Sequence, residues 1–372
     1  MNQTLLDLSP SPAPTQPSPC DRAGFQIGWD HAHHGLVPPP GWMLDGTPIC
    51  QGWMAAKAVF GRRTLTGGRS VRQWLALRLD AWHAGQSVDT TELTPNYLGQ
   101  LQTARCPVIR QALGGAPQEA QAAVFVRLNE AAGWAAGHVA MLSHAAADMA
   151  RGLSVADMIQ RARRTDDQNA AAIWWRLATL RAFATLLPFT DAVRLPLAVL
   201  PPNRVRLLNA AQGLQALITS QFLSAGWGSR LQAMATLLPA HTLRQDFNLF
   251  VGALVPRVLE AQADQIDLRR ALEDAWLGER VQRRWQHLAY SLGEAGVTAL
   301  LDRATHAGLA AQRTVNHAAE RATEGWGLDP AATAPGPRPW PAVVRQPDRR
   351  LGVRTAGRPP KNKSATTGAR LA

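Results

Sequence analysis

Cysteine is one of several things that this chain has little of. Its three cysteines, Cys20, Cys50 and Cys106, are far apart and odd in number, and none belongs to a CxxC motif. This spacing argues against a disulfide framework and against a cysteine-ligated zinc site. No basic residue precedes Arg22 and no continuous apolar run lies near it, so a signal peptide is not indicated. We expect a cytoplasmic protein that needs no metal ion and no cofactor.

Long hydrophobic runs and alternating strand patterns are also scarce. The most apolar stretches, 182–189 and 247–256, are too short to span a bilayer. Apolar residues make up 46% of the chain and recur instead at helical spacing, as Val71, Trp74 and Leu75 do. Arg72, Arg78 and Asp80 are expected outside that apolar stripe. The pattern predicts a mostly α fold, an irregular multi-helix body with no membrane association.

Four regions follow from composition and periodicity. We predict a disordered Pro-rich segment at 1–24, a mainly helical region at 25–151, a helical domain at 165–328 and a disordered basic tail at 330–372. Whether the two helical regions share one core is open at this stage. The predicted helices are 52–63, 70–84, one beginning at Thr94-Pro95, 166–187, 190–199, 203–223, 229–238, 242–262, 267–292 and 293–325.

Positive charge is concentrated at the C-terminal end. The chain carries 39 Lys and Arg against 27 Asp and Glu, a net charge of +12. From residue 331 onward the only acid is Asp348, and the tail holds +8 of that net charge. Its basic residues are Arg338, Arg345, Arg349, Arg350, Arg354, Arg358, Lys361, Lys363 and Arg370. Such segregation favours a polyanionic partner for the tail.

A short motif stands within this tail. It reads Arg354-Thr-Ala-Gly357-Arg358-Pro359-Pro360-Lys361-Asn-Lys363. The motif resembles an AT-hook, a module that binds the minor groove of A·T-rich DNA. The resemblance implies that Arg358 enters the groove between Gly357 and Pro359, while Arg354, Lys361 and Lys363 contact phosphates. Ala356 departs from the pattern, because that family usually has a basic residue there. A merely solvated basic tail is the alternative.

Two other groups of residues could contact nucleic acid. A basic patch is predicted on one helix face, formed by Arg280, Arg283, Arg284 and His287. These side chains would contact phosphates unless Glu279 or Asp274 pairs with them. Four tryptophans lie in predicted helices with arginine, and we interpret them as core rather than as a stacking platform. They are Trp174, Trp175, Trp276 and Trp285.

Remaining candidates for chemistry are interpreted structurally. His31, His33 and His34 are imidazoles, but neighbouring positions send side chains in diverging directions, and no carboxylate set completes a metal site. We therefore predict surface or loop histidines. The paired acids Asp166-Asp167 and Glu273-Asp274 are expected on exposed helix surface.

The central stretch 105–151 carries a second resemblance. Its motifs are Cys106-Pro-Val, Arg127-Leu-Asn129, Gly133-Trp134, Gly137-His138-Val139 and Ser143. They are similar to the HNH-type nuclease core of mobile elements, in which a β-hairpin and a helix hold one divalent metal ion. Val126, Ala147 and Ala150 replace its acid, asparagine and lysine, and His138 replaces another asparagine. The resemblance thus implies a core without catalysis. A pair of helices hinged at Gly133 and Gly137 is the alternative.

These observations favour one function over two others. We expect a non-enzymatic, DNA-associated α-helical protein with no catalytic residues, whose tail binds duplex DNA and which is therefore associated with the nucleoid. A helical scaffold or adaptor for a protein partner, with a solubilising tail, is the first alternative. A divergent metal-dependent nuclease is the second.

Overall fold

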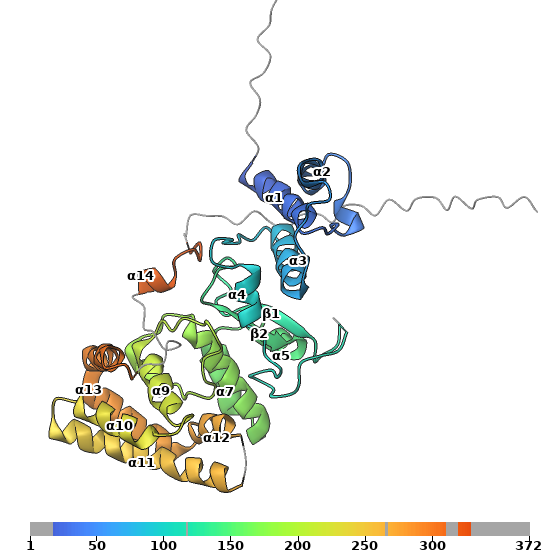
Figure 1. Ribbon diagram of the computed structural model, residues 1–372. Coiled ribbons are helices and arrows are strands. Elements are labelled where there is room, and N and C mark those ends of the chain that lie inside the picture. The colour runs from blue at the N-terminus through green and yellow to red at the C-terminus, as the bar shows by residue number, and fades with distance from the viewer. Residues whose placement is uncertain (1–17, 117, 265–266, 310–318, 329–372) are drawn as a thin grey trace, which may run out of the picture.

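The computed structural model describes residues 18–116, 118–264, 267–309 and 319–328 (Figure 1). Within these ranges the protein is mostly helical, as the sequence predicts, and no helix there is long and apolar enough to cross a membrane. The predicted disorder of residues 1–17 and of the basic tail concerns segments outside the described residues.

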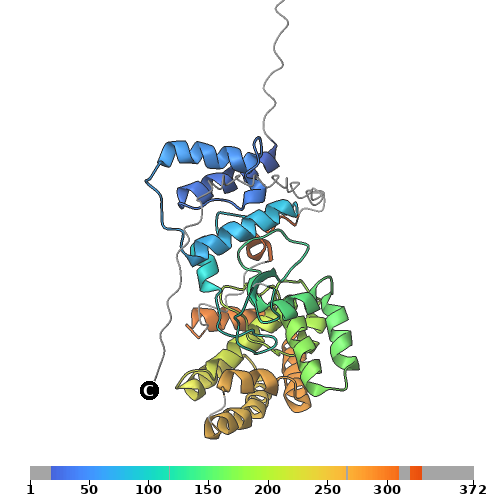
Figure 2. The same ribbon diagram turned by 90° about the vertical axis from the view of Figure 1, so that its right-hand side faces the viewer.

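Four helical segments form the N-terminal end of the body, which lies at one end of the molecule (Figure 2). They are α1 (Pro19–His33), the short 3₁₀ helix η1 (Pro40–Trp42), α2 (Pro48–Phe60) and α3 (Arg69–His83). Helix α1 begins at Pro19 because the Ser18 hydroxyl accepts a hydrogen bond from the backbone N–H of Asp21 at 3.1 Å. The disorder predicted for residues 19–24 is therefore wrong.

Helices α1 and α2 cross at two glycines. A Cβ atom at Gly28 would lie 1.9 Å from the carbonyl oxygen of Ile49, and one at Gly52 would lie 1.9 Å from that of Phe25. Only hydrogen at both positions allows the two backbones to approach so closely. The crossing fixes α1 and α2 as a unit.

Helix α3 joins this unit to the rest of the body. Arg78 was expected outside its apolar stripe, but the side chain is buried and lies 4.2 Å from the ring of Trp74. Its guanidinium pairs with Asp30 of α1 at 2.5 Å. The prediction failed because helical spacing within α3 cannot show a carboxylate that another helix supplies.

A hairpin follows α4 (Pro95–Gln100), whose N-cap is Thr94 as predicted. Strand β1 (Ala123–Arg127) pairs antiparallel with β2 (Val139–Ser143), with Arg127 opposite Val139 and Ala123 opposite Ser143. Helix α5 (His144–Ala150) continues directly from β2. The alternative of a helix pair hinged at Gly133 and Gly137 is therefore wrong. Every residue of β2 is buried, and that short apolar run supports a strand rather than one face of a helix.

Helices form the rest of the described body. They are α6 (Val155–Arg164), α7 (Gln168–Phe183), α8 (Phe189–Arg194), α9 (Ala210–Gln221), α10 (Trp227–Thr236), α11 (His241–Ala263), α12 (Leu268–Ala275), α13 (Glu279–His306) and α14 (Ala319–Ala322). The helix predicted over 267–292 is two helices, α12 and α13, with Gly278 as the N-cap of α13. Helix α13 then continues through the predicted boundary, kinked at Gly293, where φ is 68°.

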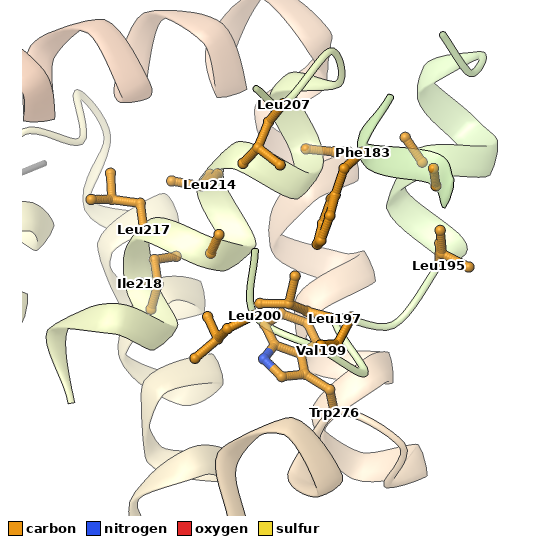
Figure 3. Close-up of a cluster of buried hydrophobic side chains, with 14 of the residues drawn as sticks. Phe183, Leu195, Leu197, Val199, Leu200, Leu207, Leu214, Leu217, Ile218 and Trp276 are labelled. Atoms are coloured by element: carbon orange, nitrogen blue, oxygen red, sulfur yellow. The ribbon is translucent and has the colours of Figure 1, made fainter. Parts of the chain in front are cut away.

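One hydrophobic core joins the two predicted helical regions. It contains Cys106 and Leu142 from the first region and Phe183, Leu217 and Trp276 from the second. Figure 3 shows part of this core, with the Trp276 indole lying beneath the side chains of the loop before α9. Residues on both sides of α5 thus share a single buried cluster, and two smaller clusters lie around α3.

The tryptophans of the later helices are core residues, as predicted for Trp276 and Trp285. Both are buried, and each indole N–H has an acceptor. The Trp276 N–H donates to the Thr219 hydroxyl at 2.9 Å, and the Trp285 N–H donates to the Val193 carbonyl at 3.0 Å. Neither indole ring is exposed to solvent, so neither can stack on a base.

The last described segment returns to the hairpin. Trp326 is fully buried, and its indole N–H donates to the Ala136 carbonyl at 3.0 Å. The backbone N–H of Gly133 donates to the Trp326 carbonyl at 2.7 Å. The segment 319–328 is therefore part of the body, and the basic tail begins just beyond it.

Replacing Trp326 tests this anchoring. We expect Trp326→Ala to lower the free energy of unfolding by about 3–5 kcal/mol, because it leaves a cavity against the hairpin loop. Leu328→Ala, at a side chain that is 44% exposed, should change it by less than about 1 kcal/mol. Urea unfolding followed by circular dichroism measures both. Equal, small effects would show that the segment does not stabilise the body.

Candidate functional site

The hairpin, α5 and α7 enclose a cleft of about 480 Å³. Its lining residues are Gln86, Phe125, Val126, Arg127, Leu128, Glu130, Trp134, Leu142, Ala147, Ala150, Arg151, Leu177, Leu180 and Arg181. Antiparallel pairing brings β1 to one side of the cleft, and helix α5, whose N-cap is Ser143, brings Ala147 and Ala150 to the other.

Three of these residues stand at positions where the nuclease-like pattern expects metal-binding or catalytic groups. Val126, Ala147 and Ala150 all line the cleft, and none has a ligand atom in its side chain. A divalent cation such as Mg²⁺ needs oxygen ligands that converge on it. Among the described residues no group of three His, Cys, Asp or Glu side chains could hold a metal ion. Hydrolysis through a metal-bound water has no support from this cleft.

The cleft presents positive charge rather than carboxylates. Glu130 is its one acidic lining residue, and Arg181 pairs with it at 2.5 Å while also donating to the Ala150 carbonyl at 3.1 Å. The Arg127 guanidinium donates to the Ala132 carbonyl and lies over the Trp134 ring. Burial lowers the pKa of Arg127. This arrangement suits an anion and is unsuited to a metal cation.

His138, the remaining possible ligand, lies away from solvent. Its ring is fully buried, with its centroid 4.2 Å from that of Trp326. Burial, followed by the positive charge of Arg127, lowers the pKa of His138 to about 3. A neutral imidazole packed beneath an indole has no open side for a metal ion and its water. The role of His138 is packing.

Cys106 of the Cys-Pro-Val motif also has a structural role. Its Sγ atom accepts hydrogen bonds from the backbone N–H and the hydroxyl of Ser143, both at 3.4 Å. The Ser143 hydroxyl in turn caps α5 by accepting from Ala146 N–H at 3.4 Å. The thiol thereby fixes the junction between β2 and α5.

A buried ionic network was missed by the sequence reasoning. Glu273 and Asp274 were expected on exposed helix surface. Asp274 is exposed as expected, but Glu273 is buried and accepts from Leu200 N–H at 2.9 Å. Arg110 pairs with Glu273 at 3.1 Å and with Asp274 at 2.7 Å. Arg176 pairs with Asp274 at 3.1 Å. The partners are about 100 to 160 residues apart, so no local pattern indicates them.

The predicted basic patch lies exposed along one helix. Arg280, Arg283, Arg284 and His287 are all on α13 at spacings of three and four residues. As expected for the alternative, Arg283 pairs with Glu279 at 3.5 Å. His287 lies 3.3 Å from Asp246 of α11. Two members of the patch therefore already have carboxylate partners. Asp274, the other acid expected to pair with the patch, pairs with Arg110 and Arg176 instead.

Two of the three clustered histidines, His31 and His33, lie at the end of α1, and His34 is its C-cap. His31 is buried, and its Nδ1 lies 2.8 Å from the Ile27 carbonyl oxygen. The His33 ring stacks on that of Phe60 with centroids 4.4 Å apart. The surface or loop position predicted for His31 is thus wrong. Burial also lowers the pKa of His31 and of His34.

The tail motif lies outside the described residues. This applies to Arg354, Gly357, Arg358, Pro359, Lys361 and Lys363. Comparison with known proteins adds nothing to these observations: no family model, no curated protein and no solved structure matches the chain.

The buried imidazole gives a pH test of this interpretation. Because the pKa of His138 falls from 6.5 to about 3 on folding, the unfolded chain binds the proton more tightly. The contribution of the neutral imidazole to the free energy of unfolding is fully present above pH 6.5. It is lost progressively as the pH falls from 6.5 towards 3. We expect the titration of His138 to lower the free energy of unfolding by about 1–2 kcal/mol between pH 7 and pH 5.

His138→Phe keeps an aromatic ring against Trp326 and should remove that component of the pH dependence. His241→Phe, at an exposed position, is the matched control and should keep the dependence of the unaltered protein. Urea unfolding at pH 7 and pH 5 measures it. If the free energy of unfolding of H138F falls between pH 7 and pH 5 by as much as that of the unaltered protein, the imidazole is not buried in neutral form.

Proposed function

We propose that this protein is a non-enzymatic, DNA-associated α-helical protein that binds duplex DNA through its basic tail. The observation that carries the proposal is the segregation of charge. The last 42 residues of the chain, 331–372, hold +8 of its net charge of +12. A duplex carries one negative charge per about 1.7 Å of its axis, and cationic side chains release its bound counterions.

The AT-hook-like motif gives the tail a means of choosing among duplexes. Gly357 allows the backbone to approach the groove floor, and the prolines at 359 and 360 favour an extended chain. An arginine at 358 is attracted by the enhanced negative potential of a narrow A·T minor groove. Ala356, in place of a basic residue, weakens that preference without removing it.

The body supports a non-enzymatic function. A β-hairpin followed by a helix is the order of elements that the nuclease resemblance implies, and the cleft lies between them. Within that cleft, Val126, Ala147 and Ala150 provide no ligands. His138 does not line the cleft and packs against Trp326. We expect no Mg²⁺- or Zn²⁺-dependent nicking of DNA.

Deleting residues 331–372 tests the role of the tail. The deletion leaves Trp326 in place, so the body keeps its anchor. We expect the full chain to bind duplex DNA with an affinity that falls steeply with salt, and the deleted protein to lose most of it. Fluorescence anisotropy with a labelled duplex at several salt concentrations measures both. Equal affinity of the two proteins would contradict the proposal.

A single substitution separates the motif from simple charge. Arg358→Ala should lower the preference for an A·T tract over a G·C duplex of equal length by several-fold. Arg370→Ala removes the same charge outside the motif and should leave that preference unchanged. Competition between the two duplexes measures the ratio directly. The AT-hook-like role fails if both variants keep the ratio of the unaltered protein, or if both lower it equally.

A further inference from the structure

The body has a basic face of its own at the α2–α3 end. Between Gly46 and Leu79 the chain contains no Asp or Glu at all. The same stretch holds six basic residues, Lys57, Arg62, Arg63, Arg69, Arg72 and Arg78. Residues 1–330 carry a net charge of +4 and this stretch alone carries +6, so the rest of the body is slightly negative. Charge in the body is therefore segregated, as it is in the whole chain.

Four of these arginines present their charge to solvent. Arg62, Arg63, Arg69 and Arg72 are exposed, and none pairs with any carboxylate in the described part of the chain. Other exposed arginines without a carboxylate partner occur in the described body, such as Arg161 and Arg163 of α6, but the stretches that hold them also contain acids, such as Asp157 in α6. Arg78 of α3, by contrast, is buried against Asp30. An arginine without a carboxylate partner keeps its full attraction for an external anion.

The loop that carries two of them has a fixed backbone. Leu65 N–H donates to the His33 carbonyl at 2.8 Å, and Arg63 N–H donates to the Phe60 carbonyl at 2.8 Å. Gly67 lies against the side chain of Leu36, where a Cβ atom would be 2.8 Å from its Cγ. Figure 2 shows this loop at the outer edge of the molecule, between α2 and α3. The arginines therefore project from a surface that is already in place.

A groove continues the basic face towards the hairpin. It has a volume of about 540 Å³ and contains no carboxylate among its lining residues. Arg69 lies at one side of it, and Gln73 and Gln102, which hydrogen-bond to each other at 3.0 Å, line it with Thr103. Amide and hydroxyl groups of this kind contact phosphate and sugar oxygens in protein–DNA interfaces.

We propose that this face, formed by Arg62, Arg63, Arg69 and Arg72, is a second DNA-binding surface that holds the phosphate backbone of a duplex bound by the tail. The choice of duplex DNA as the occupant rests on the function proposed above. The positive charge of the surface is observed independently of that function. Backbone contacts position a protein on DNA without reading its sequence. The tail then supplies the preference for A·T tracts, and this face supplies position and salt-dependent affinity.

The test uses the full chain and a triple variant, R62Q/R63Q/R69Q. Each lost phosphate contact reduces the slope of log K against log salt by about 0.9, so the slope should fall by about 2–3. The preference for A·T over G·C duplexes should not change, because the tail is intact. Anisotropy titrations of both duplexes over a range of salt concentrations measure the two quantities together.

A matched control removes the same charge elsewhere. R244Q/R257Q/R303Q replaces three exposed arginines outside the basic face, the cleft and the predicted patch, whose guanidinium groups bond to the Leu238 carbonyl, Glu260 and the Ala299 carbonyl. Its slope should change by less than about 1. The lysine variant R62K/R63K/R69K should restore most of the slope, since backbone contact requires charge more than the guanidinium shape. Circular dichroism confirms that each variant is folded.

The outcomes distinguish the two proposals. A triple variant with an unaltered slope overturns the basic face and leaves the tail proposal standing. Absence of any duplex binding by the unaltered chain overturns the tail proposal and the occupant together. Vesicles rich in anionic phospholipid provide the last arm, because Val59 and Leu65 are exposed beside the arginines. Vesicle binding that the triple variant abolishes, with duplex binding unaffected, would assign the face to a membrane surface instead.

Discussion

The buried carboxylate of Glu273 is the point on which the body depends most. It lies on α12, yet its partners come from the loop after Cys106, from the chain before α9 and from α12 itself. Asp274 adds Arg110 and Arg176 to the same network. A buried charge that loses one partner costs several kcal/mol, so the network specifies how the three segments meet.

This network and the shared hydrophobic core explain why the hairpin region is not a separate unit. Arg110 has a φ of 66°, a backbone conformation that is uncommon for a residue with a side chain. Its guanidinium pairs with both Glu273 and Asp274. Trp326 then closes the hairpin loop from the other side by bonding to Ala136 and Gly133. The central stretch is held in place by residues that are distant in sequence.

Local signals in the sequence predicted much of the helical fold. Thr94-Pro95 and the apolar stripe of α3 are examples, because caps and periodicity act within a few residues. The hairpin was not predicted from these signals, since β2 is a short apolar run whose burial depends on distant partners. Arg78 and Glu273 were misplaced for the same reason. Their carboxylate or guanidinium partners lie on other elements.

The candidate sites differ in how far sequence alone can identify them. Charge segregation in the tail is visible in composition, and so is the acid-free stretch that gives the basic face of α2 and α3. That those arginines lack partners is visible only in the fold, because Arg78 belongs to the same stretch and is paired. The cleft beside β1 required the structure as well. Its arginines and its apolar replacements together describe a cleft that suits an anion better than a metal cation.

The central claim is that the chain binds DNA as a duplex and not as an arbitrary polyanion. The most direct measurement is displacement of the full chain from a labelled A·T-rich duplex by three unlabelled competitors. These are the same duplex, a G·C duplex of equal length, and heparin at equal charge concentration. The account predicts that the A·T duplex displaces the protein at the lowest concentration, followed by the G·C duplex and then heparin. Displacement by all three at the same concentration would contradict it and favour a tail that serves only solubility.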